Sequence, residues 1–576
     1  MRRVVALLAG GAMVVSVTTS TAVADGNDGW YDRPYHGFAP STTVLSDATP
    51  AEAGLDPVPI DAALTAVDAW TRPNGTAKPL FAGAVTLLAH DGRVVTRQAT
   101  GMALKYADGS GTQLPADAQI PVRTDTIFDL ASVSKLFTSI VVMQQAEAGR
   151  VGLDAPIASY VPEFAENGKE AITVRQALTH TTGLPAWLPL WSSQPDPASR
   201  LHMALTAKLQ NPPGTKYLYS DLNLIALGEV VHRVTGKPLD QLVAEGITEP
   251  LGMTDTGYNP PAAERDRVAA TEYQVSPPRG MVRGEVHDEN AWSLGGVAGH
   301  AGVFSTAGDL AVLAQTLLNG GSYRRHRILS EDSVEQMITN LNTGFPGNDH
   351  GLGFELNQRW YMAGLSGQRT AGHTGYTGTS VVIDFDSRSF AILLTNRVHP
   401  SRSWGSNNPA RRAVAQGLAL ALGVAPRHGA DAWFTGTADN TTSTLTTDLV
   451  VPESGARLGF DLFVDAEETD LLHLESSADS GLTWTAVPFQ VRDRGVVTDT
   501  DGTFSTTGVR HWTQATATLP AGPRLLRWRM VTDPLYVGRG VYVDGVTVVA
   551  EDDRLLLDGE QDPGVFVAVG WRLANR

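Results

Sequence analysis

Two pairs of strand-like segments enclose a long helical region, and this arrangement limits the fold more than any other feature of the chain. The first pair lies within residues 82–100 and the second within residues 380–395. Between them helical periodicity predominates, most clearly at residues 133–148, 224–234 and 308–319. Strands at both ends of one unit predict a fold of the α/β (α+β) class, with one antiparallel sheet flanked by helices and a helical subdomain. We expect a cleft where the sheet and the helical subdomain meet.

The chain changes character near residues 423–430, which indicates a domain boundary. At 576 residues the chain is too long for one typical domain. Beyond Trp433 we find no convincing helix, and strand-like segments separated by turn clusters occur at residues 457–464, 471–476, 484–491, 525–530 and 541–549. We therefore predict one domain over residues 51–425 and an all-β sandwich over residues 431–576.

The N-terminus predicts export. Arg2 and Arg3 precede an apolar run at residues 4–15, and small residues follow up to Ala24, which is the pattern of a secretory signal peptide over residues 1–24. We expect cleavage after Ala24 and a secreted, extracellular protein. Residues 25–50 are polar and rich in proline and glycine, and we predict an unstructured leader there.

Charge and cysteine content exclude several classes of function. The net charge of −17 becomes −19 without residues 1–24, which hold two arginines and no acid. Such acidity argues against a nucleic acid or an anionic membrane as partner, and no later apolar run is long enough to span a membrane. The chain has no cysteine, so disulfides, thiol catalysis and cysteine metal sites are excluded.

Ser132 and Lys135 form the first candidate catalytic pair. Apolar residues recur with helical spacing from Val133 to Val141, which predicts an amphipathic helix ending near Gly149. Ser132 and Lys135 therefore lie one turn apart on the same face. A hydroxyl at a helix N-terminus lies beside free N–H groups that favour negative charge, and a neighbouring amine can accept or steer its proton.

Two further motifs follow in the chain. Tyr219-Ser220-Asp221 precedes a helical stretch, and His373-Thr374-Gly375 precedes a strand-like run. The order Ser-x-x-Lys, Tyr-x-Asn, Lys/His-Thr-Gly resembles the active-site signature of serine β-lactamases and penicillin-binding proteins, in particular class C β-lactamases, DD-peptidases and related esterases. Supporting segments that are similar to elements of this family occur at residues 174–185, 284–305 and 393–400.

The resemblance implies a role for each motif residue in acyl transfer. Ser132 would attack a carbonyl carbon, while Lys135 and Tyr219 share the proton transfers. The backbone N–H groups of Ser132 and Tyr376 would form the oxyanion hole. Substrate-binding roles are expected for three residues near the motifs, namely Thr374, Gly375 and Asn223.

Two residues depart from the commonest family pattern. Asp221 stands where the family has asparagine, and a carboxylate has no N–H to donate to a substrate amide, although it can still hold Lys135. We therefore predict weak β-lactamase activity, with Asn223 as a candidate replacement donor. His373 stands where lysine is usual, and we expect its charge to change near neutral pH, so that recognition of a substrate carboxylate weakens in alkaline medium.

The leading hypothesis is an exported serine hydrolase that forms an acyl-enzyme on Ser132. Its substrate would be an ester, a D-amino-acid peptide derived from peptidoglycan, or a β-lactam, so the enzyme would be of the D-Ala-D-Ala carboxypeptidase or esterase type. The alternative is a non-catalytic penicillin-binding or cell-wall-binding protein. A metal hydrolase using five candidate residues has no supporting ligand spacing, and we expect no metal and no cofactor; those residues are His287, Asp288, His300, His373 and His399.

The C-terminal segment offers a second candidate binding function. Residues 477–484 and 541–546 resemble jelly-roll accessory domains of secreted bacterial hydrolases, which often bind glycans or calcium. A cell-wall glycan is therefore an expected partner. The scattered acids, such as Asp439 and Asp544, favour solvated turns over a calcium site.

Overall fold

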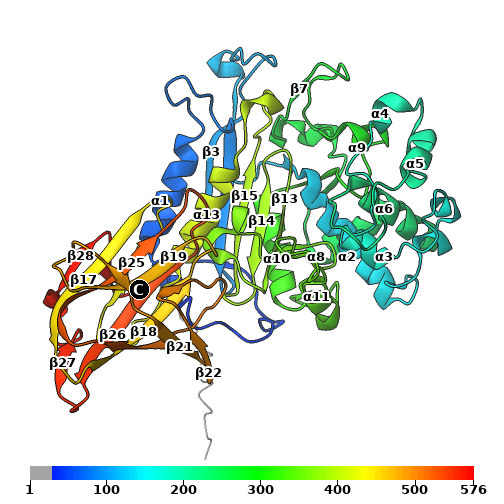
Figure 1. Ribbon diagram of the computed structural model, residues 1–576. Coiled ribbons are helices and arrows are strands. Elements are labelled where there is room, and N and C mark those ends of the chain that lie inside the picture. The colour runs from blue at the N-terminus through cyan, green and yellow to red at the C-terminus, as the bar shows by residue number, and fades with distance from the viewer. Residues whose placement is uncertain (1–28) are drawn as a thin grey trace, which may run out of the picture.

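The computed structural model describes residues 29–576, and its N-terminal part is built on one mixed sheet with strand order β1-β3-β2-β15-β14-β13-β12 (Figure 1). Neighbouring strands are antiparallel except at one edge, where β1 runs parallel to β3. This confirms the predicted sheet apart from that edge. The strands are β1 (Ser46–Asp47), β2 (Gly83–His90), β3 (Arg93–Leu104), β12 (Glu355–Leu356), β13 (Thr370–Thr374), β14 (Ser380–Asp384) and β15 (Ser389–Thr395), and β4 (Ile120–Pro121) pairs with β3.

The centre of the sheet joins β2 to β15, which come from opposite ends of the domain. Every residue of both strands is buried. Alternate side chains of a strand point to opposite faces. Val85 and Leu87 enter the hydrophobic cluster on one face. Ala84 and Leu88 enter the cluster on the other. Because both faces are covered, these strands read in the sequence as continuous apolar runs.

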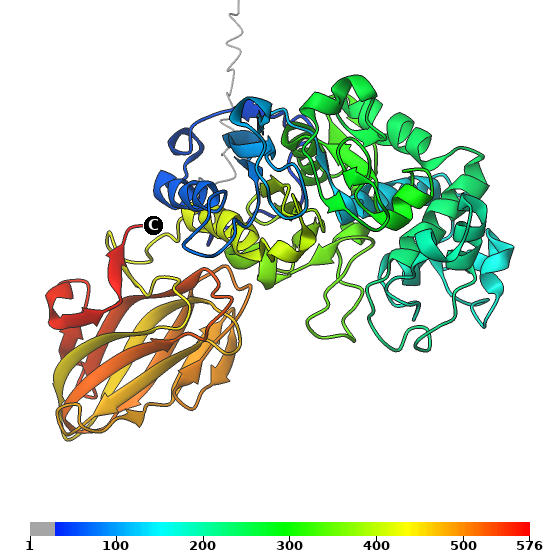
Figure 2. The ribbon, with the colours of Figure 1, turned by 90° about the horizontal axis from the view of Figure 1, so that it is seen from above.

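Helices cover the two faces unequally. Helices α1 (Pro57–Ala69) and α13 (Asn408–Ala421) pack on the face toward the C-terminal domain together with the short α12 (Arg359–Met362), and a larger group of helices lies on the opposite side (Figures 1 and 2). The larger group forms the predicted helical subdomain. Its members are α2 (Ser134–Glu147), α3 (Val174–Leu178), α4 (Leu190–Ser193), α5 (Pro197–Leu205), α6 (Asp221–Thr235), α7 (Leu239–Val243), α8 (Glu249–Leu251), α9 (Glu289–Ser293), α10 (Ala307–Leu318) and α11 (Glu331–Met337), while α12 (Arg359–Met362) follows β12.

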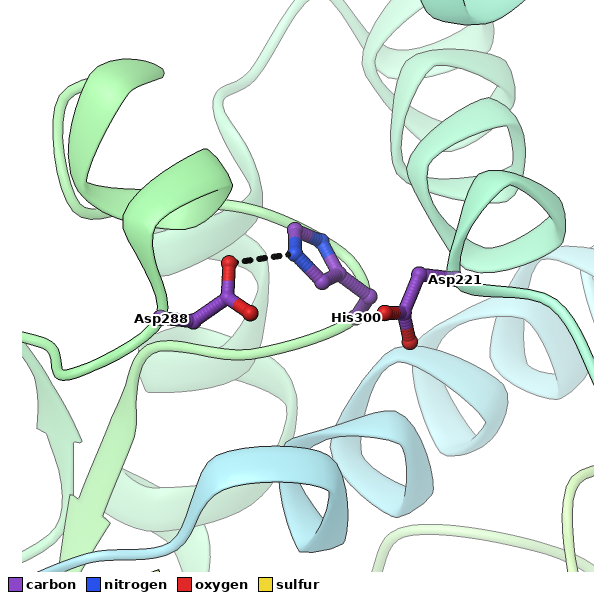
Figure 3. A group of neighbouring side chains, drawn as sticks. All are labelled: Asp221, Asp288 and His300. Carbon is purple, nitrogen blue, oxygen red and sulfur yellow. Dashed lines mark hydrogen bonds and ion pairs between the residues drawn. The ribbon is translucent and has the colours of Figure 1, made fainter. Parts of the chain in front are cut away.

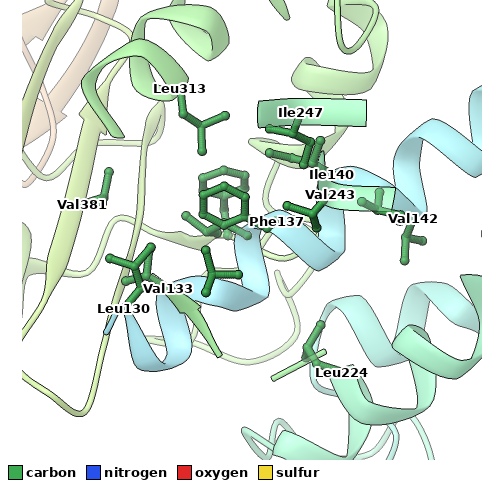
Figure 4. Close-up of a cluster of buried hydrophobic side chains, with 14 of the residues drawn as sticks. Leu130, Val133, Phe137, Ile140, Val142, Leu224, Val243, Ile247, Leu313 and Val381 are labelled. Carbon is green, nitrogen blue, oxygen red and sulfur yellow. The ribbon is translucent and has the colours of Figure 1, made fainter. Parts of the chain in front are cut away.

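Helix α2 is the central element of this packing. Phe137 and Ile140 lie in the cluster that fills the space between the sheet, α10 and the subdomain, with Leu224 of α6 on the far side (Figure 4). All residues from Ser134 to Met143 are buried. The predicted amphipathic helix therefore has no exposed polar face over residues 134–143, because neighbouring elements cover this part of α2 on every side.

The C-terminal part is a sandwich of two sheets, as predicted. One sheet has the order β22-β21-β24-β18-β26-β16-β29, and the other has the order β20-β19-β25-β17-β28. Their inner faces bury Trp528 and Phe460 among aliphatic side chains. The main strands are β16 (Ala432–Phe434), β17 (Thr442–Val451), β18 (Ala456–Asp465), β19 (Leu471–Ser477), β20 (Thr485–Ala486), β21 (Phe489–Asp493), β22 (Val496–Asp499), β24 (Thr513–Leu519), β25 (Gly522–Val531), β26 (Gly540–Ala550), β28 (Phe566–Val569) and β29 (Arg572–Ala574).

The two domains are joined through one shared core. Tyr31, Leu365 and Phe463 belong to the same buried cluster although they come from the leader, the first domain and the sandwich. Two buried ion pairs cross the junction, Arg510 with Asp384 at 2.6 Å and Arg359 with Asp465 at 2.9 Å. The sandwich is therefore fixed against the first domain.

The leader contributes directly to this junction. Tyr31 is 1% exposed, its N–H donates to the carbonyl of Gly423, and its hydroxyl donates to the carbonyl of Gly364. The prediction of an unstructured leader is wrong for residues 29–50. A high content of proline and glycine does not leave this segment unstructured, because aromatic side chains such as Tyr31 bury apolar surface. The predicted signal peptide, residues 1–24, lies outside the described residues.

Within residues 29–576, no helix combines the length and the apolar character that crossing a membrane requires.

Candidate active site

Ser132 lies in a single 3-10 turn, Ala131–Val133, directly before α2. Ala131 has a positive φ of 47°, an uncommon conformation for a residue with a side chain. The carboxylate of Asp129 stabilises this turn by accepting from the Ala131 N–H at 2.9 Å. The turn presents Ser132 at the wall of a cleft of about 360 Å³, as predicted for the junction of sheet and subdomain.

Lys135 is held by three oxygens. Its Nζ donates to Ser132 Oγ at 2.9 Å and to the carbonyl of His300 at 3.1 Å, and it forms an ion pair with Asp221 at 2.8 Å. Burial alone would lower the pKa of Lys135, but the Asp221 carboxylate and the Tyr219 hydroxyl raise it above its ordinary value. Lys135 is therefore an ammonium group in the resting site and donates to the nucleophile.

Tyr219 hydrogen-bonds to both Ser132 and Lys135. Burial raises the pKa of its hydroxyl to about 12, and the Lys135 ammonium offsets only part of this shift. The resting Tyr219 is consequently a neutral phenol, so it can pass a proton only by accepting one as it gives up another. Its ring packs against His180, with ring centroids 4.6 Å apart.

Asp221 occupies the first turn of α6, whose N-cap is Ser220. A carboxylate is favoured there because free N–H groups and the helix dipole stabilise negative charge. Its ion pair with Lys135 confirms that an acid in the place of asparagine can still hold the lysine.

The strand β13 brings the third motif beside Ser132. The hydroxyl of Thr377 donates to the carbonyl of Asp129 at 2.7 Å, and that of Thr379 donates to the carbonyl of Leu130 at 2.9 Å. These bonds tie the loop after β13 to the residues that precede the nucleophile. Among the described residues, no acceptor engages the N–H of Ser132 or of Tyr376, so both remain available to an oxyanion.

Two substrate-side predictions are wrong. Asn223 is fully buried, with its Oδ1 accepting from the Thr182 hydroxyl at 2.7 Å and its Nδ2 bonded to His180 at 3.1 Å, so it cannot replace the missing donor. Burial lowers the pKa of His373 to about 3, so its charge does not change near neutral pH. Thr374 and Gly375 line the cleft, and their substrate-binding role stays a prediction.

Three charged residues of the cleft were not predicted from the sequence: Glu355, Arg397 and Arg411. Burial raises the pKa of Glu355 to about 7. Arg411 donates to the carbonyl of Gly375 at 2.6 Å. Arg397 lies inside residues 393–400, a segment noted only for its similarity to the family, whereas the two-residue strand that holds Glu355 carries no periodic signal.

Asp288 and His300 lie beside Asp221, the partner of Lys135 (Figure 3). Nε2 of His300 bonds to Asp288 at 2.9 Å, and donor atoms of Asp221, Asp288 and His300 lie within 4.8 Å of one another. Lys135 already supplies a cation to this group, because it pairs with the Asp221 carboxylate, and it also donates to the backbone carbonyl of His300. We therefore interpret these three side chains as a group that positions Lys135, and not as a metal site.

Comparison with known proteins establishes the relationship that the motifs suggest. The family model described as Beta-lactamase matches residues 73–416, a span that contains all three motifs. The chain belongs to the beta-lactamase family. The predicted resemblance and fold class are thereby confirmed, and the protein is a serine hydrolase of the beta-lactamase and penicillin-binding-protein family. The sandwich lies beyond the matched residues.

Relatives of this beta-lactamase family member include two named "Putative D-alanyl-D-alanine carboxypeptidase". The one from Escherichia coli (strain K12) is 33% identical over 398 residues, which are 64% of this chain and 88% of the relative. The one from Salmonella agona (strain SL483) is 31% identical over 394 residues, 63% of this chain and 88% of the relative. A solved penicillin-binding protein homologue from Caulobacter crescentus covers 64% of this chain and 99% of its own, with 23% identity and a TM-score of 0.49.

Proposed function

We propose that the protein is an exported DD-carboxypeptidase with esterase activity, which releases the terminal residue of D-amino-acid peptides derived from peptidoglycan. The observation that carries the proposal is the 2.9 Å hydrogen bond from Lys135 to Ser132 beside the cleft. The names of the curated relatives support this substrate class. Arg397 and Arg411 line the cleft and provide positive charge for a terminal carboxylate.

The proposed reaction has two steps that use the same residues. Ser132 Oγ bonds to the carbonyl carbon while its proton moves to the Tyr219 oxygen, and Tyr219 gives its own proton to the departing amine or alcohol. Lys135 stabilises the negative charge that develops along this path, and the N–H groups of Ser132 and Tyr376 stabilise the oxyanion. Water then attacks the acyl carbon, and the proton transfers run in reverse.

The test compares the mature enzyme with Ser132→Ala on a peptide ending in D-Ala-D-Ala, on p-nitrophenyl acetate and on a fluorescent penicillin. We expect Ser132→Ala to lose the penicillin adduct and to lower turnover of peptide and ester by about 10³-fold or more. Ser139→Ala is a matched control, because this buried hydroxyl of α2 has no hydrogen-bond partner among the described residues.

The outcomes distinguish four possible activities of the protein. Release of D-Ala with a slowly lost penicillin adduct supports a carboxypeptidase, and turnover of the ester alone supports an esterase. Rapid loss of the penicillin adduct supports a β-lactamase. A stable adduct with no turnover of any substrate would support the non-catalytic penicillin-binding alternative.

Export and glycan binding remain part of the proposal. The pattern of residues 1–24 supports export, and a pull-down of the mature protein on purified peptidoglycan, with and without residues 431–576, tests the sandwich as a cell-wall-binding domain. We expect retention of the full chain and loss of retention without the sandwich.

A further inference from the structure

Three carboxylates converge at one end of the sandwich, far from Ser132 in the chain. Glu467 and Asp470 lie in the loop between β18 and β19, and Asp533 follows β25. One carboxylate oxygen of each lies within 4.8 Å of those of the other two. The Thr469 hydroxyl donates within the group, to Asp533 at 3.0 Å and to Glu467 at 3.2 Å.

Asp470 is the buried member of this group. Its side chain is 0% exposed, and its Oδ1 accepts from the Asp533 N–H at 2.8 Å. Its Oδ2 is buried and has no hydrogen-bond partner among the described residues. A carboxylate oxygen that is buried without a partner is costly, because it has lost its hydration and gained nothing in exchange.

Nearby positive charge does not neutralise the group. Arg359 lowers the pKa of Asp470, but its guanidinium already pairs with Asp465 at 2.9 Å. Burial and then the charge of Asp533 raise the pKa of Glu467 to about 7. Burial likewise raises the pKa of Asp470 to about 6, and its backbone bond to Asp533 only partly opposes this. The negative charge of Asp533 thus opposes ionisation of both Glu467 and Asp470.

We propose that Glu467, Asp470 and Asp533 form a calcium-binding site. Calcium is a hard cation that takes six to eight oxygen ligands in irregular arrangements, and water completes a shell that protein carboxylates begin. These three acids come from two loops of the sandwich, so the interpretation of its acids as solvated turns is revised for them. The inference revises the prediction of no metal.

Bound calcium would join two loops that also contact the first domain. The β18–β19 loop follows Asp465, the partner of Arg359, and the loop that contains Asp533 leads to Gly538, whose carbonyl accepts from Gln416 at 3.1 Å. The ion is therefore placed to stabilise the sandwich at the side where it meets the first domain. Because none of the three acids lines the catalytic cleft, loss of the ion would affect stability more than chemistry.

The test measures calcium binding by the full mature chain after treatment with EGTA. Extracellular calcium modules bind with Kd values of about 10⁻⁴–10⁻³ M, so titration calorimetry and thermal unfolding should extend to about 10 mM CaCl₂. We expect one calcium per chain and a rise in Tm of about 3 °C or more. Terbium luminescence sensitised by nearby aromatic residues provides a second readout.

Asp470→Asn and Asp533→Asn should each weaken calcium binding at least tenfold. Asp501→Asn is the control, because that exposed sandwich acid bonds only within its own turn. In EGTA, Asp470→Asn should be as stable as wild type or more stable, because it removes a repelled charge; a merely structural role for Asp470 would lower stability in EGTA as well.

Two results would overturn the assignment. One is the absence of both a calcium heat and a Tm shift in the wild type. The other is an equal effect of MgCl₂ at the same concentration, which would show that the site does not distinguish calcium.

Discussion

Nζ of Lys135 lies 2.9 Å from Oγ of Ser132 and donates a hydrogen bond to it. Lys135 is thus a protonated ammonium group beside the nucleophile, and it is not a neutral amine that could accept the serine proton. The ordinary assignment of a lysine as the base that removes the serine proton does not describe this resting site. Tyr219, which contacts both residues, is the group through which that proton can move.

Asp221→Asn should separate the two roles of this side chain. The change removes the charge that keeps buried Lys135 protonated, so we expect kcat for an ester to fall about tenfold to 10²-fold. An asparagine amide can donate to a substrate amide carbonyl, so cephalosporin turnover relative to ester turnover should rise. Steady-state kinetics with both substrates measure the ratio. An unchanged ratio would contradict the donor argument, and Asp154→Asn, in a surface ion pair, serves as the control.

The pH dependence of carboxylate recognition should follow Glu355 and not His373. The pKa of Glu355 is raised to about 7 by burial, so this side chain is neutral below that pH and negative above it. KM for a peptide with a free terminal carboxylate should therefore rise between pH 6 and pH 8. Glu355→Gln should flatten the profile, whereas His373→Asn should leave its shape unchanged, because His373 stays neutral across this range. A flat profile for His373→Asn would restore the histidine to that role.

Gly375→Ala should impair the oxyanion hole. A Cβ at this position would lie 2.1 Å from Thr379 Oγ1 and 2.2 Å from the carbonyl oxygen of Leu130, so the loop would have to move and carry the N–H of Tyr376 with it. We expect kcat to fall about 10²-fold with little change in KM. Gly344→Ala is a suitable control because nothing lies within 4 Å of its Cβ position. Equal kcat values for both variants would show that the loop after β13 does not contribute to catalysis.

Arg510→Met should destabilise the junction between the domains. The variant leaves Asp384 buried without its partner, so we expect the free energy of unfolding to fall by about 3–5 kcal/mol. Adding Asp384→Asn should recover part of that loss. Denaturant unfolding of the full chain measures the free energy of unfolding. The control is Arg175→Met, which breaks an exposed ion pair with Asp154 and should lower that free energy by no more than about 1 kcal/mol. A small effect of Arg510→Met would mean that the apolar cluster alone holds the domains together.

The sequence predicted those parts of the fold and site that local patterns encode. The catalytic helix, predicted over residues 133–148, runs from Ser134 to Glu147, and the predicted helix at 308–319 runs from Ala307 to Leu318. Ser132, Lys135, Tyr219 and Asp221 come together as the motifs indicate. Spacing and order suffice for such residues because each motif sits at the boundary of one regular element.

The errors arise where tertiary packing decides. Asn223 lies in the first turn of α6, on the side that faces His180, and its side chain therefore points into the core and not into the cleft. His373 is neutral because its side chain is buried, which lowers its pKa. Glu355 enters the cleft through the pairing of β12 with β13, a contact that no local pattern in either strand records.

The pairing of β2 with β15 has a consequence for the way the chain must fold. His90 and Ser389 hydrogen-bond across this pair although 299 residues separate them. A chain that leaves the ribosome or crosses a membrane from its N-terminus exposes β2 with one bare edge until nearly 300 further residues have followed. Contacts so distant in sequence form slowly. The order in which the strands emerge therefore makes the unfinished sheet, and not the completed enzyme, the state most in need of protection from aggregation.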